Sequence, residues 1–234
     1  MTDARAPRAL PPGAPILAID TALVRAVVAL GTAHGTLVAE VGWEAGHRHG
    51  EELLPRLKSL LAAHDTPLAS VRGVVVGTGP GAFTGLRVGL ATAKALAHGL
   101  GVQIVGISTA AALLDAATST EGRPTLTLLL PAGPSDRVLV SAGRASLLSA
   151  GMEPDPEQLD GLVAVDLPGR APPAALARGE AAVAGLGASL VGLGGRRLAT
   201  GDADDVALLV PEYVTLPRGV ISERGEVAWS HGPR

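Results

Sequence analysis

The spacing of hydrophobic residues changes along the first half of the chain. Three short apolar runs, separated by turns, predict strands that pair as an antiparallel meander: residues 16–20, 25–30 and 35–43. Leucines then recur at steps of three and four over residues 51–64, a spacing that predicts an amphipathic helix. Strands and helices alternate after it, at 71–76, 84–100, 103–107 and 109–117. The order βββαβαβα predicts an α/β fold built on a mixed sheet.

The second half of the chain has a weaker pattern. Short apolar runs predict strands at 124–130, 138–142 and 162–165, and helical stretches are predicted at 174–190 and 204–210. Pro211-Glu212-Tyr213-Val214 predicts a terminal strand or an extended arm. We divide the chain into a flexible extension (1–14), an N-terminal subdomain (15–117), a diverged C-terminal subdomain (118–217) and a flexible tail (218–234).

Composition and charge narrow the class of protein. Hydrophobic residues make up 47% of the 234 residues and charged residues 18%, values typical of a well-buried globular protein. The net charge of -3 argues against a broad nucleic-acid surface, which needs a basic bias. The absence of cysteine excludes disulfides and thiolate chemistry. No apolar run reaches the ~18 residues of a membrane span and no signal peptide is evident, so we expect a cytoplasmic protein with no membrane contact.

A glycine-rich loop at residues 77–81 is the first candidate for chemistry. In Gly79-Pro80-Gly81 the proline fixes φ, and backbone amides next to a helix N-terminus can hold an anion. One interpretation is therefore a phosphate or nucleotide loop. The other is a tight strand-to-helix connection that needs glycine for its geometry alone, since the Lys-Ser/Thr of a P-loop is missing. The loop by itself leaves both open.

The helix that follows this loop has one face made of small residues. Gly85, Gly89, Ala93 and Ala97 recur every four residues and form a stripe of small residues, along which another helix backbone can approach closely. That second helix could be residues 51–64 of this chain or a helix of another chain.

Four motifs in the first half resemble the TsaB/YeaZ family in order and spacing. They are IDTA at 19–22, HGEELLP at 49–55, GTGPGAFTGLRVGLATAKALA at 77–97 and VGIST at 105–109. The resemblance covers about residues 15–117. It implies two ribonuclease-H-like subdomains of the actin-like and sugar-kinase ATPase superfamily, with mixed sheets flanked by helices. It further implies a non-catalytic scaffold or activating subunit for the synthesis of threonylcarbamoyladenosine beside the tRNA anticodon.

The resemblance also implies partners and cofactors. The expected partners are a TsaD-type catalytic subunit and a TsaE-type ATPase, with a homodimer when the chain is alone and tRNA contacted only indirectly. No tightly bound cofactor and no metal ligand are expected in this chain, and ATP or ADP with Mg would act at the level of the complex. The two N-terminal helices form the expected interface, through Leu53, Leu57, Leu60, Leu61, Gly85, Gly89, Ala93 and Ala97. A vestigial nucleotide site is expected at Asp20, Thr21, Gly79, Gly81 and Thr84.

Departures from the family pattern keep two other functions open. Residues 131–143 lack the Asp-Ala-Arg and Tyr that often open the second subdomain, and residues 106–112 lack the His pair of the metal-dependent TsaD-type relatives. A nucleotide-binding or phosphotransfer enzyme of the same superfamily is the main alternative, with Asp20 as its metal-coordinating carboxylate. Asp20 could instead accept backbone N–H bonds in the turn that follows it. A metallopeptidase is the least favoured, because its ligands are not found in the sequence.

Overall fold

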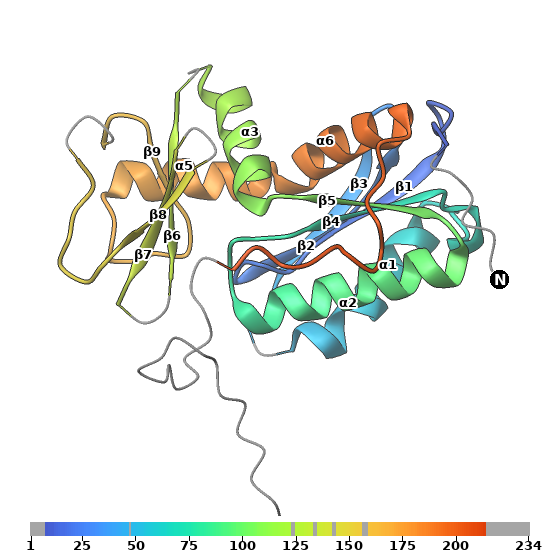
Figure 1. The fold of residues 1–234 in the computed structure, drawn as a ribbon, viewed down its shortest axis with the longest axis horizontal. Coiled ribbons are helices and arrows are strands. Elements are labelled where there is room, and N and C mark those ends of the chain that lie inside the picture. Colours follow the sequence, from blue (N-terminus) through green and yellow to red (C-terminus); the bar gives the residue numbers. More distant parts are fainter. Residues whose placement is uncertain are drawn as a thin grey trace, which may run out of the picture.

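The computed structural model describes residues 8–46, 48–122, 125–132, 135–141, 144–155 and 159–213. It contains two β-sheets that lie side by side, with helices packed around them (Figure 1). The predicted tail (218–234) and the first seven residues of the predicted extension lie outside the described residues.

The first sheet has the strand order β3-β2-β1-β4-β5. Its strands are β1 (Pro15–Asp20), β2 (Arg25–Thr32), β3 (Leu37–Glu44), β4 (Gly73–Gly77) and β5 (Gln103–Ile107). The first three pair antiparallel, which confirms the predicted meander, and β4 and β5 continue the sheet in parallel with β1. Strands β1 and β4 are buried over almost their whole length, because helices cover both faces of the sheet.

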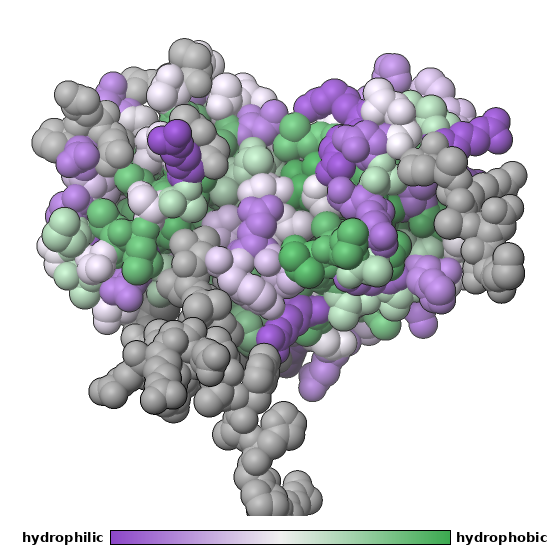
Figure 2. All heavy atoms as spheres, viewed as in Figure 1, coloured by the Kyte–Doolittle hydropathy of each residue, from purple (hydrophilic) through white to green (hydrophobic). Residues whose placement is uncertain are grey.

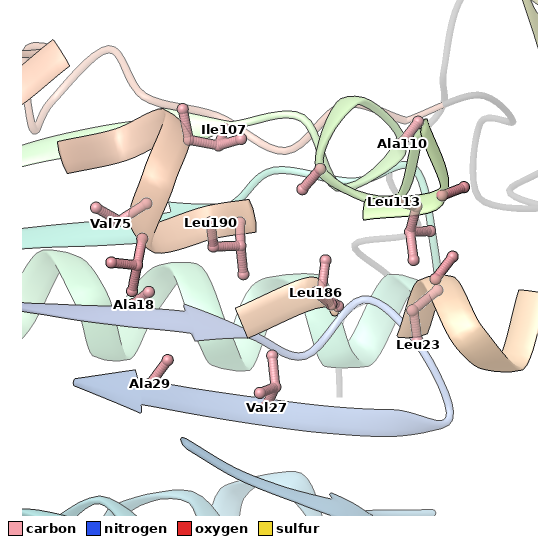
Figure 3. Packing of buried hydrophobic residues seen from close by; sticks show 14 of the residues in the cluster. Ala18, Leu23, Val27, Ala29, Val75, Ile107, Ala110, Leu113, Leu186 and Leu190 are labelled. Carbon is pink, nitrogen blue, oxygen red and sulfur yellow. The ribbon is translucent and has the colours of Figure 1, made fainter. Parts of the chain in front are cut away.

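Three helices cover the faces of this sheet. On one face, α1 (His49–Ala63) and α2 (Phe83–Leu100) pack against Leu17, Ile19 and their neighbours. The opposite face is covered by α6 (Leu186–Thr200), which comes from the other end of the chain. Figure 3 shows Leu186 and Leu190 of α6 beside the inward side chains of β1, β2 and β4. Alternate residues of each strand therefore serve two separate hydrophobic cores, as the period of two requires.

The second sheet repeats the strand order of the first. It runs β8-β7-β6-β9, with β6 (Thr127–Pro131), β7 (Arg137–Ser141), β8 (Arg144–Leu148) and β9 (Leu162–Ala164). As in β3-β2-β1-β4, the first three strands in sequence form an antiparallel meander and the fourth pairs in parallel with the first of them. Helices α3 (Thr109–Glu121) and α5 (Pro173–Ala184) pack against each other beside this sheet. The chain is therefore a duplicated α/β fold.

Two helix predictions in the second half were wrong. The helix predicted at 174–190 is two helices, α5 and α6, which meet at Gly185 at an angle of 54°. Gly187, near the start of α6, has a packing role, because a Cβ there would lie 2.1 Å from Glu40 of the first sheet. Residues 204–210 form no helix; Asp204 makes an isolated antiparallel bridge with Ile104. Strand β8 was not predicted.

No single helix in the described part of the chain has both the length and the hydrophobicity of a membrane span, although α5 and α6 taken together as a bent pair do.

Candidate functional site

The end of β1 and the glycine loop meet around the carboxylate of Asp20. This side chain is completely buried. The Ala22 amide donates to Asp20 Oδ1 at 2.7 Å, and the Thr109 hydroxyl, from the first residue of α3, donates to Oδ2 at 2.7 Å. Burial raises the pKa of Asp20 from 3.8 to about 6, although both hydrogen bonds act to lower it. The bond from Ala22 is the one expected if Asp20 fixes the turn after β1.

The glycine loop is closed against this carboxylate. A Cβ on Gly77 would lie 1.8 Å from Asp20 Oδ2, so a larger residue does not fit there. The Gly79 amide donates to Thr109 Oγ1 at 3.0 Å, and the Thr109 amide donates to the Gly79 carbonyl at 2.7 Å. The loop, β1 and α3 are thus joined by one continuous set of hydrogen bonds.

The start of α2 is packed just as closely on the turn after β1. The Ala82 amide donates to the Ala22 carbonyl at 2.6 Å, and the Thr21 hydroxyl donates to the Gly85 carbonyl at 2.6 Å. A Cβ atom on Gly81 would lie 2.2 Å from one carbonyl oxygen of this turn, and a Cβ on Gly85 would lie 1.9 Å from another. The two glycines of the small-residue stripe, Gly85 and Gly89, therefore allow close approach of the chain's own turn.

Four of the five predicted nucleotide-site residues come together in this region. Asp20, Thr21, Gly79 and Gly81 lie within it as described above. Thr84 does not, because α2 begins at Phe83 and Thr84 is exposed in its first turn. The N-cap is Ala82, which makes no side-chain capping bond, and α2 begins one residue before the predicted start at 84. Whether this region holds a nucleotide stays a prediction.

The residues predicted for a partner interface are all buried within this chain. They line the core between α1, α2 and the first sheet: Leu53, Leu57, Leu60, Leu61, Gly85, Gly89, Ala93 and Ala97. In this fold they are not available to a partner. The same two helices expose other residues, among them Leu54 on α1 and Ala91 and Ala95 on α2. That a partner binds these helices stays a prediction, and it would have to use such outward positions.

Sequence reasoning predicted a strand or extended arm from residue 211 but missed the longer segment to which it belongs, residues 202–213, which we call the strap. It crosses the edge of the first sheet in front of α2 (Figure 1). Arg197 of α6 forms ion pairs with Asp202 and Asp204 of the strap at 2.7 Å and 3.0 Å. The hydrogen bond to Asp202 is the main reason why the pKa of Arg197 lies above its usual value. The Pro-Glu-Tyr motif at 211–213 was the only sequence signal for this segment.

Two cavities lie beside the glycine loop, between the two sheets. The first, of about 400 Å³, is lined by the turn after β1, the start of α2, the ends of β6 and β7, and Asp166. Burial raises the pKa of Asp166, whose Oδ2 accepts the Val24 amide at 2.8 Å. The second, of about 560 Å³, is lined by α3, by Val140 and Ala145 of the second sheet, and by the strap.

The histidines and carboxylates of the described residues form no group of three or more that could hold a metal ion. His49 is buried at the first residue of α1, whereas His47 lies outside the described residues.

Together, the duplicated strand order and the glycine loop between the two sheets define an α/β protein with two mixed sheets flanked by helices. A model of the family "TsaD: tRNA N6-adenosine threonylcarbamoyltransferase" matches residues 41–194, more than half of the chain. The YeaZ structure from Pseudomonas aeruginosa aligns with 86% of this chain and 100% of its own at a TM-score of 0.66, with 21% identity. It supports the fold.

Curated relatives match less than half of the chain. The tRNA threonylcarbamoyladenosine biosynthesis protein TsaB of Escherichia coli is 35% identical over 107 residues, which are 46% of this chain and 46% of that protein. An uncharacterized protein of Mycobacterium tuberculosis is 39% identical over 93 residues, 39% of this chain and 44% of that protein. The chain thus spans less than half the length of these curated relatives. It belongs to the family that the model "TsaD: tRNA N6-adenosine threonylcarbamoyltransferase" describes.

Proposed function

We propose that this chain is a non-catalytic scaffold subunit in the synthesis of tRNA threonylcarbamoyladenosine, and that it activates a TsaD-type transferase by binding it. The TsaB name of its relatives and the family match support the pathway. The observation that carries the scaffold role is the closed glycine loop. The places beside Gly81 and Gly85 that a phosphate would need are occupied by backbone atoms of residues 21–22.

The physical argument concerns the amides at the start of α2. A helix N-terminus binds an anion through amides that have no partner in the helix. Here the Ala82 amide already donates to Ala22, and the Thr21 hydroxyl is used on Gly85. A phosphate bound at the Ala82 amide would have to displace the bond to Ala22. The loop therefore serves better as a rigid support for α2 than as a nucleotide site.

We propose that the partner binds the outward faces of α1 and α2. On α2 these positions include Ala91 and Ala95, which are one helical turn apart and exposed, with Leu54 exposed on α1. Small side chains on an exposed ridge allow a partner helix to approach closely.

We also propose that a TsaE-type ATPase joins the assembly, that ATP or ADP with Mg acts at the level of the complex, and that tRNA is reached through the partner. The cytoplasm is the proposed location, and a homodimer the proposed state of the isolated chain.

Co-purification with the TsaD-type protein of the same organism tests the proposal. The native chain should pair with it, and Ala95→Arg should abolish pairing because a long charged side chain prevents close helix contact. Ala177→Arg makes the same change on the exposed side of α5 and should leave pairing intact. Failure of the native chain to pair at micromolar concentration would overturn the proposal. Equal loss in both variants would remove the assignment to α2.

A nucleotide-binding enzyme of the same superfamily is the second candidate. The buried carboxylate of Asp20 favours it, because it lies directly beneath the glycine loop. Saturable binding of ATP with Mg to the isolated chain, lost in Asp20→Ala while the fold is retained, would support this function over the scaffold. A titration without binding at millimolar ATP would reject it.

A further inference from the structure

The strap is held to the fold at two places of different character. At its beginning, the Asp204 amide donates to the Ile104 carbonyl at 2.9 Å, and Asp204 Oδ2 accepts the Gly106 amide at 2.7 Å. Arg197 adds a charged pair with the same carboxylate. This end is therefore fixed to the edge of β5 by backbone pairing and by an ion pair together.

The other end of the strap is held by hydrogen bonds and a ring contact. The Glu212 amide donates to the Thr78 carbonyl at 2.7 Å, and the Thr78 hydroxyl donates to Glu212 Oε1 at 2.5 Å. The Tyr213 ring lies 5.1 Å from that of Phe83, and Arg87 Nε donates to the Tyr213 hydroxyl at 3.2 Å. Tyr213 is nevertheless 39% exposed. Thr78 is buried, whereas Glu212 and Tyr213 are exposed, so water reaches the strap side of these contacts.

Between the two ends, the strap leaves large apolar side chains in water. Leu208 is 76% exposed and Val210 is 65% exposed, while Leu209 between them packs against Gly106 and Thr78. Figure 2 shows hydrophobic residues at the surface of this face, where the strap crosses in front of α2. Beyond Leu209, the residues Val210, Glu212 and Tyr213 are exposed as well.

This end of the strap lies between the two cavities. Pro80 and Tyr213 are the residues that both cavities have in their lining, and Glu212 lines the second cavity as well. Pro80 is fixed in the glycine loop, which packs tightly on the turn after β1. Of these two residues, Tyr213 is the one that can move away from the cavities. Its departure would join the two cavities into one cleft between the sheets.

We propose that residues 210–213 act as a gate, which opens while the Asp204 end stays fixed, and which in its closed state covers the cleft between the two sheets. Opening breaks the Thr78–Glu212 bonds and removes the Tyr213 ring from Phe83 and Arg87. The gate follows from the contacts of this chain alone and does not rest on the proposed function.

Thiol labelling tests the gate cleanly, because the chain has no cysteine of its own. A single cysteine is placed in each cavity, by Ala132→Cys in the first and Ala110→Cys in the second. In each background, Thr78→Val removes the bond to Glu212 but leaves the Tyr213 ring in place. If opening precedes labelling, loss of one hydrogen bond should raise the labelling rate at both positions about fivefold.

Matched variants separate gating from general loosening. Thr84→Val makes the same change on the exposed face of α2 and should leave both rates unchanged, and Ala62→Cys on α1 should label equally in all backgrounds. Unchanged rates in a folded Thr78→Val variant would overturn the gate. Should that variant not fold, amide exchange in the native chain decides: Glu212 should exchange faster than Asp204, and equal protection of the two amides would refute the proposal.

Discussion

The buried carboxylate of Asp20 gives the sharpest prediction for stability. Its pKa is 3.8 in an ordinary environment and about 6 in the folded chain, chiefly because of burial. Between these two pH values the folded state holds more protons than the unfolded state. The contribution of Asp20 to stability therefore falls as the pH rises through this window and stays constant above it. A shift of about two pKa units corresponds to about 3 kcal/mol of unfolding free energy.

Asp20→Asn should remove this cost and keep the geometry. The amide oxygen can accept the Ala22 N–H, and the amide nitrogen can donate to Thr109 Oγ1 in place of the present bond. At pH 7 the variant should exceed the native chain by up to about 3 kcal/mol, and the difference should vanish near pH 4.

Urea unfolding followed by circular dichroism at pH 4, 5, 6 and 7 measures this difference. Glu180→Gln, an exposed change on α5, serves as the control and should show the same pH dependence as the native chain. A variant that is less stable than the native chain at every pH would refute the reasoning. That result would mean that the charged carboxylate is stabilised in place by its hydrogen bonds.

Two further predictions concern packing and the strap. Gly81→Ala should destabilise the chain by about 1–3 kcal/mol, because its Cβ would lie 2.2 Å from the Ala22 carbonyl oxygen. Gly50→Ala, in open space on α1, should stabilise the chain by up to about 1 kcal/mol. Thermal unfolding compares the two variants, and equal effects on stability would contradict the close contact at Gly81. Arg197→Met should lower the free energy of unfolding by about 2–3 kcal/mol, because hydrogen bonds to two carboxylates and a carbonyl are lost. Arg196→Met, at an exposed position, should change it little. A small effect of Arg197→Met in urea unfolding would contradict the proposal that this end of the strap is fixed.

The sequence predicted most of the first sheet because its signals are local. Strands β1 to β5 and helices α1 and α2 follow from apolar runs and from the spacing of hydrophobic residues. The glycine loop follows from its glycine-rich sequence. The same signals predicted a small-residue stripe on α2 but not what packs against it. Gly85 meets Thr21, which is 64 residues away in sequence, and spacing within one helix carries no information on such a partner.

The second half was harder to predict for the same reason. Strand β8 has exposed side chains along most of its length, so it lacks an apolar run. The strap has no regular structure; its contacts join residues as far apart as Thr78 and Glu212. Elements that are stabilised by contacts with residues distant in sequence give little signal in the local spacing of hydrophobic residues.

The crossing of α6 onto the first sheet has a consequence for how the chain must be made. Strands β1 to β5 are complete by residue 107, but the helix that covers one face of their sheet begins at Leu186. During synthesis that apolar face stays uncovered until α6 has left the ribosome. Neither half is then a folding unit by itself. The two sheets must reach their native state together, through contacts of very long sequence separation, which are the slow ones to form.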